Sequence, residues 1–351
     1  MNNSIVLLNC VLLVVYNLRA GVGAVVRCAP PPLLPPLPPP LPPHRLYACR
    51  VQRSQIEASI PREIPQDDFS CVDMYSRLQH DTKQWWRFTL VTPGQFGSML
   101  TRLRAILPGD RRHPFHISLE NRLLLTLHWL VQYPTCDDLS LQFGVSPAMV
   151  WRTQLSFAVA LSVVQRHFCS DLCNPAAVER LRGRFRCFPA AIGIIDCTHH
   201  DREKPTKNQG IWYRRDIGHH TITTQIICDY TGKPIHVSAG YPGSCHDMRI
   251  FQDSGAAHLL RPGDRLLADQ GYMKGPFISP YAQLDPSPEH QHFNKCLKEI
   301  RPRVEQTHRF LKRFRCLSTR WRHCIVLQPI CVLAVAGICA EQLNDFPIYY
   351  E

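Results

Sequence analysis

The chain has 351 residues, and its 40 Lys and Arg outnumber its 28 Asp and Glu, which leaves a formal net charge of +12. This excess of positive charge argues against a cationic partner and favours a polyanion, with nucleic acid as the first candidate. The 16 Cys are scattered through apolar runs without a CxxC pair, which argues against a disulfide scaffold and a structural zinc site and for buried thiols in a reducing compartment.

Residues 1–45 form an apolar leader rich in Pro and Leu. Its first apolar run, from Ser4 to Tyr16, is too short to span a bilayer and lacks the basic start of a secretory signal. Residues 30–43 contain only Pro and Leu, a composition typical of polyproline II rather than of a packed core. We therefore expect a flexible leader, no stable membrane partner, and a folded region that begins near residue 46.

Residues 46–184 are predicted to form a helical region. Thr92, Pro93 and Gln95 have the spacing of a helix start with a capping box, and apolar residues follow at helical intervals. A second helix is expected between Ser118 and Val131, because leucines recur along it at helical spacing. Both helices are interpreted as packing elements.

A helix-turn-helix pattern follows at about residues 135–156. A short helix would end at Gly144, and a capped second helix would begin just after it. If the pattern binds DNA, the second helix exposes Trp151, Arg152 and Gln154 to a major groove. Many helical hairpins only pack and touch no DNA, so both interpretations stay open.

Residues 185–345 change to an α/β pattern. Four strands are expected, at residues 191–196, 221–229, 234–239 and 265–269. The first is an apolar run that ends in Asp196, as a buried central strand that delivers a carboxylate to a sheet rim would. The second and third form a hairpin, and the fourth returns beside the first and ends in Asp269. The two carboxylates are therefore expected to meet at the rim.

The segment RPRVEQTHRFLKRFRCL predicts a helix that carries Glu305 on a polar stripe able to face this rim. The basic residues of this segment are dense enough to suggest contacts with DNA phosphates, and the candidates are Arg309, Lys312, Arg313 and Arg315. The closing apolar segment, residues 324–343, contains Gln328 and Pro329, which favours a buried helix over a membrane span.

Asp196, Asp269 and Glu305 offer the oxygen ligands that hard divalent cations prefer, and a cation would relieve their mutual repulsion. Two such ions could polarise a phosphodiester and activate a water molecule. Each acid also has an alternative structural role as a cap, a turn residue or a solvated helix charge. Asp247 has two interpretations, because it has capping-box spacing with Ser244 and also lies in a loop near the same rim.

Four ordered segments, GIIDCTHH, YPGSCHD, LLADQGY and RPRVEQTHRFLKRFRCL, resemble the catalytic domain of PIF/Harbinger-type transposases, and most closely the Harbinger transposase-derived nucleases of animals. The likeness covers about residues 188–343 and, through WWRFTLVTPGQFGSMLTRL, extends upstream to about Trp85. It implies an α/β fold in which an RNase H-like mixed sheet is flanked by helices and preceded by the helical region. It also implies divalent Mg²⁺ or Mn²⁺ at an Asp-Asp-Glu triad formed by Asp196, Asp269 and Glu305, with Asp247 as a further metal position.

The leading hypothesis is a metal-dependent, transposase-derived nuclease that hydrolyses DNA phosphodiester bonds. The main alternative is a domesticated, catalytically inactive protein that binds DNA or acts as a scaffold, and a third is a secreted disulfide protein whose leader is cleaved. The resemblance further implies a Myb-like DNA-binding partner protein and a location in the nucleus, and also in the cytoplasm.

Overall fold

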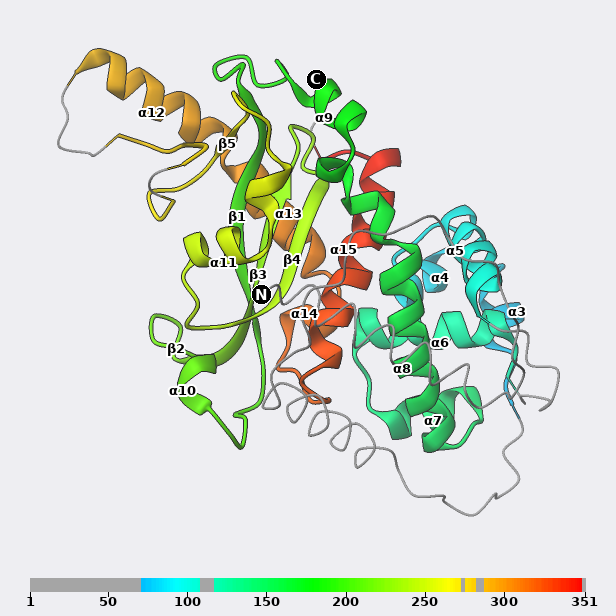
Figure 1. The fold of residues 1–351 in the computed structure, drawn as a ribbon. Coiled ribbons are helices and arrows are strands. Elements are labelled where there is room, and N and C mark those ends of the chain that lie inside the picture. The colour runs from blue at the N-terminus through cyan, green and yellow to red at the C-terminus, as the bar shows by residue number, and fades with distance from the viewer. Residues whose placement is uncertain (1–70, 108–116, 273–274, 282–286, 349–351) are drawn as a thin grey trace, which may run out of the picture.

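The computed structural model describes residues 71–107, 117–272, 275–281 and 287–348. The predicted leader, residues 1–45, lies outside these residues. The described residues form a six-stranded mixed sheet with strand order β2-β3-β1-β5-β6, and β4 pairs with β3 (Figure 1). The strands are β1 (Ala191–Asp201), β2 (Tyr213–Arg214), β3 (His219–Cys228), β4 (Pro234–Pro242), β5 (Arg265–Leu267) and β6 (Phe277–Ile278). Helices cover both faces of this sheet, as the α/β prediction required.

The two antiparallel strands β3 and β4 are joined by the predicted turn at residues 229–232. The Asp229 carboxylate oxygen Oδ1 accepts hydrogen bonds from the backbone N–H groups of Thr231 at 2.8 Å and Lys233 at 3.0 Å. Gly232 has a φ of 88°, a backbone conformation that glycine adopts readily. Local turn chemistry therefore sets this hairpin.

Strand β1 differs from the prediction, because it does not end at Asp196 but continues to Asp201. Its pairing with β3 is antiparallel and extends past Asp196, which lies opposite Ile226, as far as Asp201 opposite Thr221. On its other side β1 pairs in parallel with β5, which ends at Leu267 opposite Ile194. Asp196 therefore lies at a rim only on its β5 side, where the neighbouring strand has stopped.

The helices before the sheet are α3 (Met74–Leu78), α4 (Thr82–Thr89), α5 (Pro93–Ile106), α6 (Leu119–Gln132), α7 (Cys136–Phe143), α8 (Pro147–Val164) and α9 (Pro175–Leu181), with the 3₁₀ turns η1 (Arg166–Cys169) and η2 (Asp171–Cys173).

The predicted capping box of α5 is confirmed. The Thr92 hydroxyl accepts from the N–H of Gln95 at 3.2 Å, and the Gln95 side chain accepts from the N–H of Thr92 at 3.1 Å. The predicted helix between Ser118 and Val131 is confirmed as α6.

Helices α7 and α8 have the predicted helix, turn and helix, with Gly144 in the left-handed conformation between them. The expected exposure of α8 was wrong, because Trp151 is only 5% exposed and Gln154 is fully buried. Arg152 is exposed. Helix α8 packs against α5, α6, α7 and α15, so its sides are occupied by protein. Of the three side chains proposed for a major groove, Arg152 alone faces solvent.

The later helices are α10 (Gln209–Trp212), α11 (Asp247–Asp253), α12 (Pro288–Ile300), α13 (Pro302–Leu311), α14 (Arg315–Ser318) and α15 (Leu327–Asp345), with the 3₁₀ turn η3 (Ala256–Leu259). Apolar residues of α12 and α13 pack on one face of the sheet, while those of α9 and α11 pack on the other. Helix α15 contacts both α8 and β4 (Figure 1). Among the described residues, α8 and α15 are long and apolar enough to cross a membrane by length and composition, yet both are mostly buried inside the protein. The prediction of a buried closing helix is confirmed.

Candidate active site

Two aspartates meet beside the end of β5. The parallel register places Ile194 opposite Leu267, so Asp196 and Asp269, each two residues further on, lie at corresponding positions of neighbouring segments. The pKa of Asp196 is raised to about 6, chiefly by burial and in smaller part by the carboxylates of Asp269 and Asp247, while the N–H of Cys197 and the charge of Arg301 oppose the rise. The predicted meeting of Asp196 and Asp269 is therefore confirmed, and Asp247 joins them.

Backbone N–H groups orient both aspartates. Oδ1 of Asp196 accepts a hydrogen bond from the N–H of Cys197 at 2.8 Å, and Oδ1 of Asp269 accepts one from the N–H of Gly271 at 2.9 Å. The bond to Gly271 is the turn interaction considered as the structural role of Asp269. The turn and the carboxylate cluster coexist, because the turn uses one carboxylate oxygen.

The capping-box role predicted for Asp247 and Ser244 was wrong. The helix starts at Asp247, and the cap is His246, whose Nδ1 accepts from the N–H of Met248 at 3.3 Å. Ser244 instead donates its hydroxyl to the carbonyl of Ile211 at 2.7 Å. Burial raises the pKa of Asp247, and the Asp269 carboxylate adds to the effect while a hydrogen bond from the Cys197 thiol opposes it. Asp247 is thus half-buried beside the other aspartates without a capping task.

Glu305 lies on α13, on the helix face that is turned toward Asp196. Arg301 and His308 precede and follow it by four and three residues, which places all three on one face, and both interact with Asp196. Glu305 itself is exposed. Among the described residues, no three His, Cys, Asp or Glu side chains are close enough together to hold a metal ion. The three aspartates are close enough to influence one another's pKa, but they do not form a metal site as they are placed here, and Glu305 is not among the groups that shift the pKa of Asp196.

Buried histidines next to the cluster were not identified as site residues from the sequence. Nδ1 of His308 lies 3.9 Å from Oδ2 of Asp196, but burial lowers the pKa of His308 to about 3, so this contact is not an ion pair at neutral pH. Burial also lowers the pKa of His199 to about 4 and that of His200 to about 3. The half-buried Lys312 lies near all three. A neutral imidazole, that of His308, therefore lies beside Asp196 on the side that faces α13.

A polar node on the other face of the sheet joins the three segments that carry the aspartates. The fully buried Gln225 of β3 donates from Nε2 to the carbonyl of Asp247 at 3.0 Å and to the hydroxyl of Tyr272 at 3.0 Å. The thiol of Cys197, next to Asp196, lies 3.5 Å from that hydroxyl and 3.6 Å from the Gln225 amide. The sequence contained one signal for this node, because Gln225 is a polar residue within a run of Thr and Ile that reads as a buried strand.

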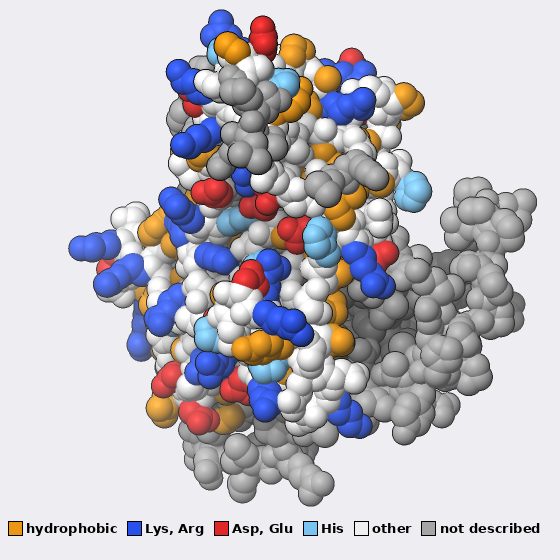
Figure 2. Space-filling model, turned by 90° about the vertical axis from the view of Figure 1, so that its left-hand side faces the viewer, with side chains coloured by type: hydrophobic (Ala, Val, Ile, Leu, Met, Phe, Trp, Pro, Cys, Tyr) orange, Lys and Arg blue, Asp and Glu red, His pale blue; other side chains and the backbone are white. Residues whose placement is uncertain are grey.

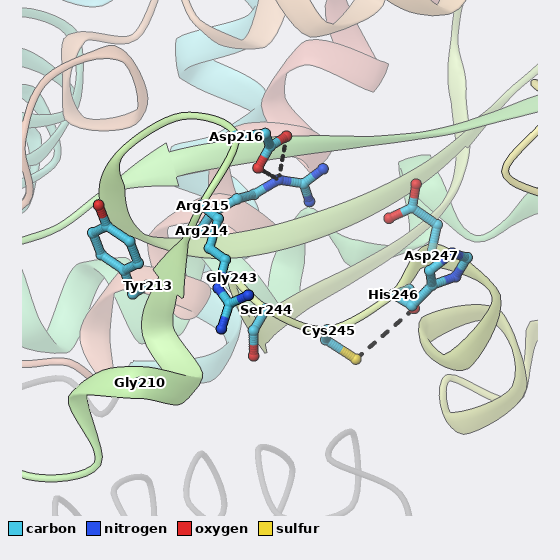
Figure 3. A pocket seen from close by; sticks show the side chains of 10 residues that line it. All are labelled: Gly210, Tyr213, Arg214, Arg215, Asp216, Gly243, Ser244, Cys245, His246 and Asp247. Carbon is cyan, nitrogen blue, oxygen red and sulfur yellow. Dashed lines mark hydrogen bonds and ion pairs between the residues drawn. The ribbon is translucent and has the colours of Figure 1, made fainter.

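A cavity of about 570 Å³ lies beside Asp247, between the β2–β3 hairpin and the loop before α11 (Figure 3). We call it the hairpin cavity, and its lining consists of Gly210, Tyr213, Arg214, Arg215, Asp216, Gly243, Ser244, Cys245, His246 and Asp247. The guanidinium of Arg214 donates from Nε to both carboxylate oxygens of Asp216, at 2.9 and 3.0 Å. Tyr213 and Asp247 stand on opposite sides of the cavity, with arginine side chains between them (Figure 3).

The basic residues predicted to contact DNA do not share one surface. Lys312 is turned toward the buried histidines, whereas the guanidinium of Arg313 lies over the rings of Phe310 and, at 5.5 Å, Trp86. Arg309 and Arg315 are exposed. The face that carries β2, α11 and α12 shows many Lys and Arg side chains interspersed with acids and histidines (Figure 2). The positive charge is therefore spread over this face rather than concentrated on α13.

Residues 195–340, the span that contains all four predicted acids, match the model of a family described as DDE superfamily endonuclease. Over this span the chain is similar to DDE superfamily endonucleases. A transposase for insertion sequence element IS702 of Microchaete diplosiphon is 26% identical over 220 residues, which cover 58% of this chain and 74% of the relative. The HARBI1 protein of Bos taurus, named as a nuclease, is 24% identical over 210 residues, or 58% of this chain and 60% of the relative.

An ALP1-like protein of Arabidopsis thaliana is 24% identical over 155 residues, which cover 43% of this chain and 37% of that protein. No solved structure matches the chain significantly. The resemblance to Harbinger-derived nucleases is confirmed, and the mixed sheet flanked by helices agrees with an RNase H-like domain. The matched part of the chain corresponds to about 60% of the length of the bovine relative.

DDE superfamily endonucleases generally use divalent metal ions, and the donor chemistry of this domain fits such ions. The three clustered side chains offer only carboxylate oxygens, the ligands that Mg²⁺ and Mn²⁺ prefer. The pKa of Asp196 is raised mainly by burial and in part by the neighbouring carboxylates, and a bound cation would oppose both effects. Among the described residues, however, the carboxylates of Asp196, Asp247 and Asp269 would have to move closer together before they could bind one ion jointly.

Proposed function

We propose that this domain is a metal-dependent nuclease that hydrolyses DNA phosphodiester bonds. The observation that carries the proposal is the approach of Asp196, Asp247 and Asp269 beside the end of β5, where burial and the neighbouring carboxylates raise the pKa of Asp196 and of Asp247. Divalent ions bound there would polarise the phosphodiester and lower the pKa of an attacking water molecule. The family match and the excess of positive charge agree with a phosphodiester substrate.

Each acidic and basic side chain has a separate role in this proposal. Asp196 and Asp269 are fixed by backbone hydrogen bonds and present their remaining oxygens, while Asp247 assists from the start of α11. Glu305 is exposed on α13, and a rotation of its flexible side chain toward Asp196 would complete the site. The exposed Arg309 and Arg315 contact phosphates away from the reacting bond.

The test is a plasmid-nicking assay with Mn²⁺, combined with calorimetric titration of Mn²⁺ into the same samples. Asp196→Asn and Glu305→Gln should each abolish nicking, with folding and DNA affinity largely kept. Asp253→Asn, an exposed acid on α11 paired with Arg249, is the matched control and should retain activity. Full nicking by both of the first two variants would rule out the assigned site.

The alternative is a domesticated protein that binds DNA without cleaving it, and the exposed position of Glu305 is the observation that favours it. Folded protein that binds DNA but takes up no Mn²⁺ would support this alternative. A nuclear location, together with a cytoplasmic pool and a Myb-like partner protein, is a further part of the proposal. Fractionation and copurification of the native chain would test it.

A further inference from the structure

Helix α10 and the β2–β3 hairpin that follows it carry large apolar side chains on their surface. Ile211 is 46% exposed, Tyr213 40% and Ile217 39%. They are placed among basic residues, which include Lys204, Lys207 and Arg215. Exposed rings and aliphatic groups set among cations are typical of surfaces that stack the bases and neutralise the phosphates of unpaired nucleic acid.

The hairpin cavity is held at a fixed position relative to Asp247. Ser244 binds the Ile211 carbonyl twice, through its hydroxyl at 2.7 Å and its backbone N–H at 3.1 Å. Gly243 packs so closely that an added Cβ would lie 2.3 Å from Oγ1 of Thr221 and 2.7 Å from the carbonyl oxygen of Trp212. These contacts hold the loop before α11 against α10 and the hairpin. The cavity therefore keeps a fixed position relative to Asp247, the first residue of α11.

Charge within the hairpin cavity is distributed unevenly. Arg214 is paired with Asp216 through its Nε, whereas Arg215 forms no ion pair within the described part of the chain. Arg215 is exposed and borders the cavity between Tyr213 and Asp247. A cation and an aromatic ring next to the carboxylates suit an anionic phosphate that carries a planar base.

We propose that the hairpin cavity holds an unstacked nucleotide of the DNA strand next to the bond that is cleaved. The base would stack on Tyr213, and its phosphate would contact Arg215. The cavity volume of about 570 Å³ lies within the usual range of small-ligand sites, which suits one or two nucleotides rather than a duplex. The proposal rests on the proposed function, because it assumes that DNA is the substrate.

The test measures binding of a 12-nucleotide single strand that contains 2-aminopurine, and of the matching duplex, to the full chain in EDTA. Tyr213→Ala and Arg215→Ala should each weaken single-strand binding at least about fivefold and change duplex binding less than about twofold. Tyr213→Phe should restore both the affinity and the fluorescence change, because it keeps the ring. Since no metal is present and no cleavage is recorded, the result does not depend on nuclease activity.

Matched controls come from the same chain. Tyr281→Ala removes another exposed tyrosine, which stacks on His290 outside the cavity, and Arg77→Ala removes an exposed arginine on the distant helix α3. Both should bind as wild type does. Unchanged binding in the two cavity variants, an equal loss for single strand and duplex, or a wild-type chain that binds only duplex would each overturn the proposal.

Discussion

At the scale of single residues, Asp196 has the clearest functional signature. Its carboxyl is mostly buried, near two other aspartates, and its pKa is raised from 3.8 to about 6. The folded state therefore holds this proton more tightly than the unfolded chain does. Stability is lost as the pH rises through the interval between these values, and it stays lost at neutral pH. A carboxylate that served only to stabilise the fold would not be expected to lower the stability at neutral pH in this way.

The first prediction follows from that sign. In metal-free protein at pH 7.5, Asp196→Asn should raise the free energy of unfolding by roughly 3 kcal/mol, the cost that corresponds to the raised pKa. The gain should disappear near pH 4, where wild-type Asp196 is protonated. Thermal unfolding at both pH values measures the stability difference between Asp196→Asn and the wild type, with Asp253→Asn as the control. A stability difference that is the same at pH 4 and pH 7.5 would contradict the prediction.

At the scale of elements, the site depends on how β1, β3, the segment after β5 and the start of α11 are joined. Gln225 makes these connections from one buried side chain, through Asp247 and Tyr272. Neighbouring residues of β1 serve different faces of the sheet, so Asp196 is turned toward α13 while Cys197 belongs to the node. We infer that Gln225 positions the aspartates without contacting the substrate.

The second prediction tests this positioning role. Gln225→Leu should weaken Mn²⁺ binding and slow nicking about 10-fold or more, because residues that orient metal ligands typically have effects of this size. The matched control is Gln328→Leu. Gln328 is also fully buried, and the substitution removes its 3.1 Å hydrogen bond to the carbonyl of Asp201, which lies on β1, the strand of Asp196. Both variants should lose similar thermal stability. Equal losses of metal affinity in the two variants would show that the role of Gln225 is only structural.

At the scale of the whole molecule, the helical region and the sheet share a core. One apolar cluster contains Trp129 of α6, Phe157 of α8 and Ile338 of α15, and it extends to Ile222 and Ile226 of β3. Gly337 of α15 approaches the backbone of Gln165 so closely that an added Cβ would lie 2.5 Å from its carbonyl oxygen. Helix α15 is thus the layer between the two regions.

The third prediction concerns a chain that starts at residue 185. Without α5 to α8 it would expose the side of α15 that packs on α8, so we expect aggregation or a loosely packed state. A chain that starts at residue 71 should unfold cooperatively. Near-UV circular dichroism and calorimetry distinguish the two, and a soluble, cooperatively unfolding fragment from residue 185 would contradict the prediction.

Local signals along the chain predicted much of this protein. The Asp229 turn, the Thr92 capping box, the buried closing helix and the meeting of Asp196 with Asp269 follow from turn chemistry, capping and apolar periodicity. Such features depend on residues close in sequence or on simple topology rules. The order of the four motifs added the family resemblance, which the comparisons confirm.

Only the tertiary structure decided the features that depend on distant neighbours. Trp151 is buried beside His323, which stacks on its ring from far along the chain, and the continuation of β1 past Asp196 requires β3 as a pairing partner. The cap of α11 falls to His246, because the Ile211 carbonyl captures Ser244. In each case a local preference competes with contacts from another element, and the packed contact determines the outcome, because burial and hydrogen bonding across elements exceed weak local propensities.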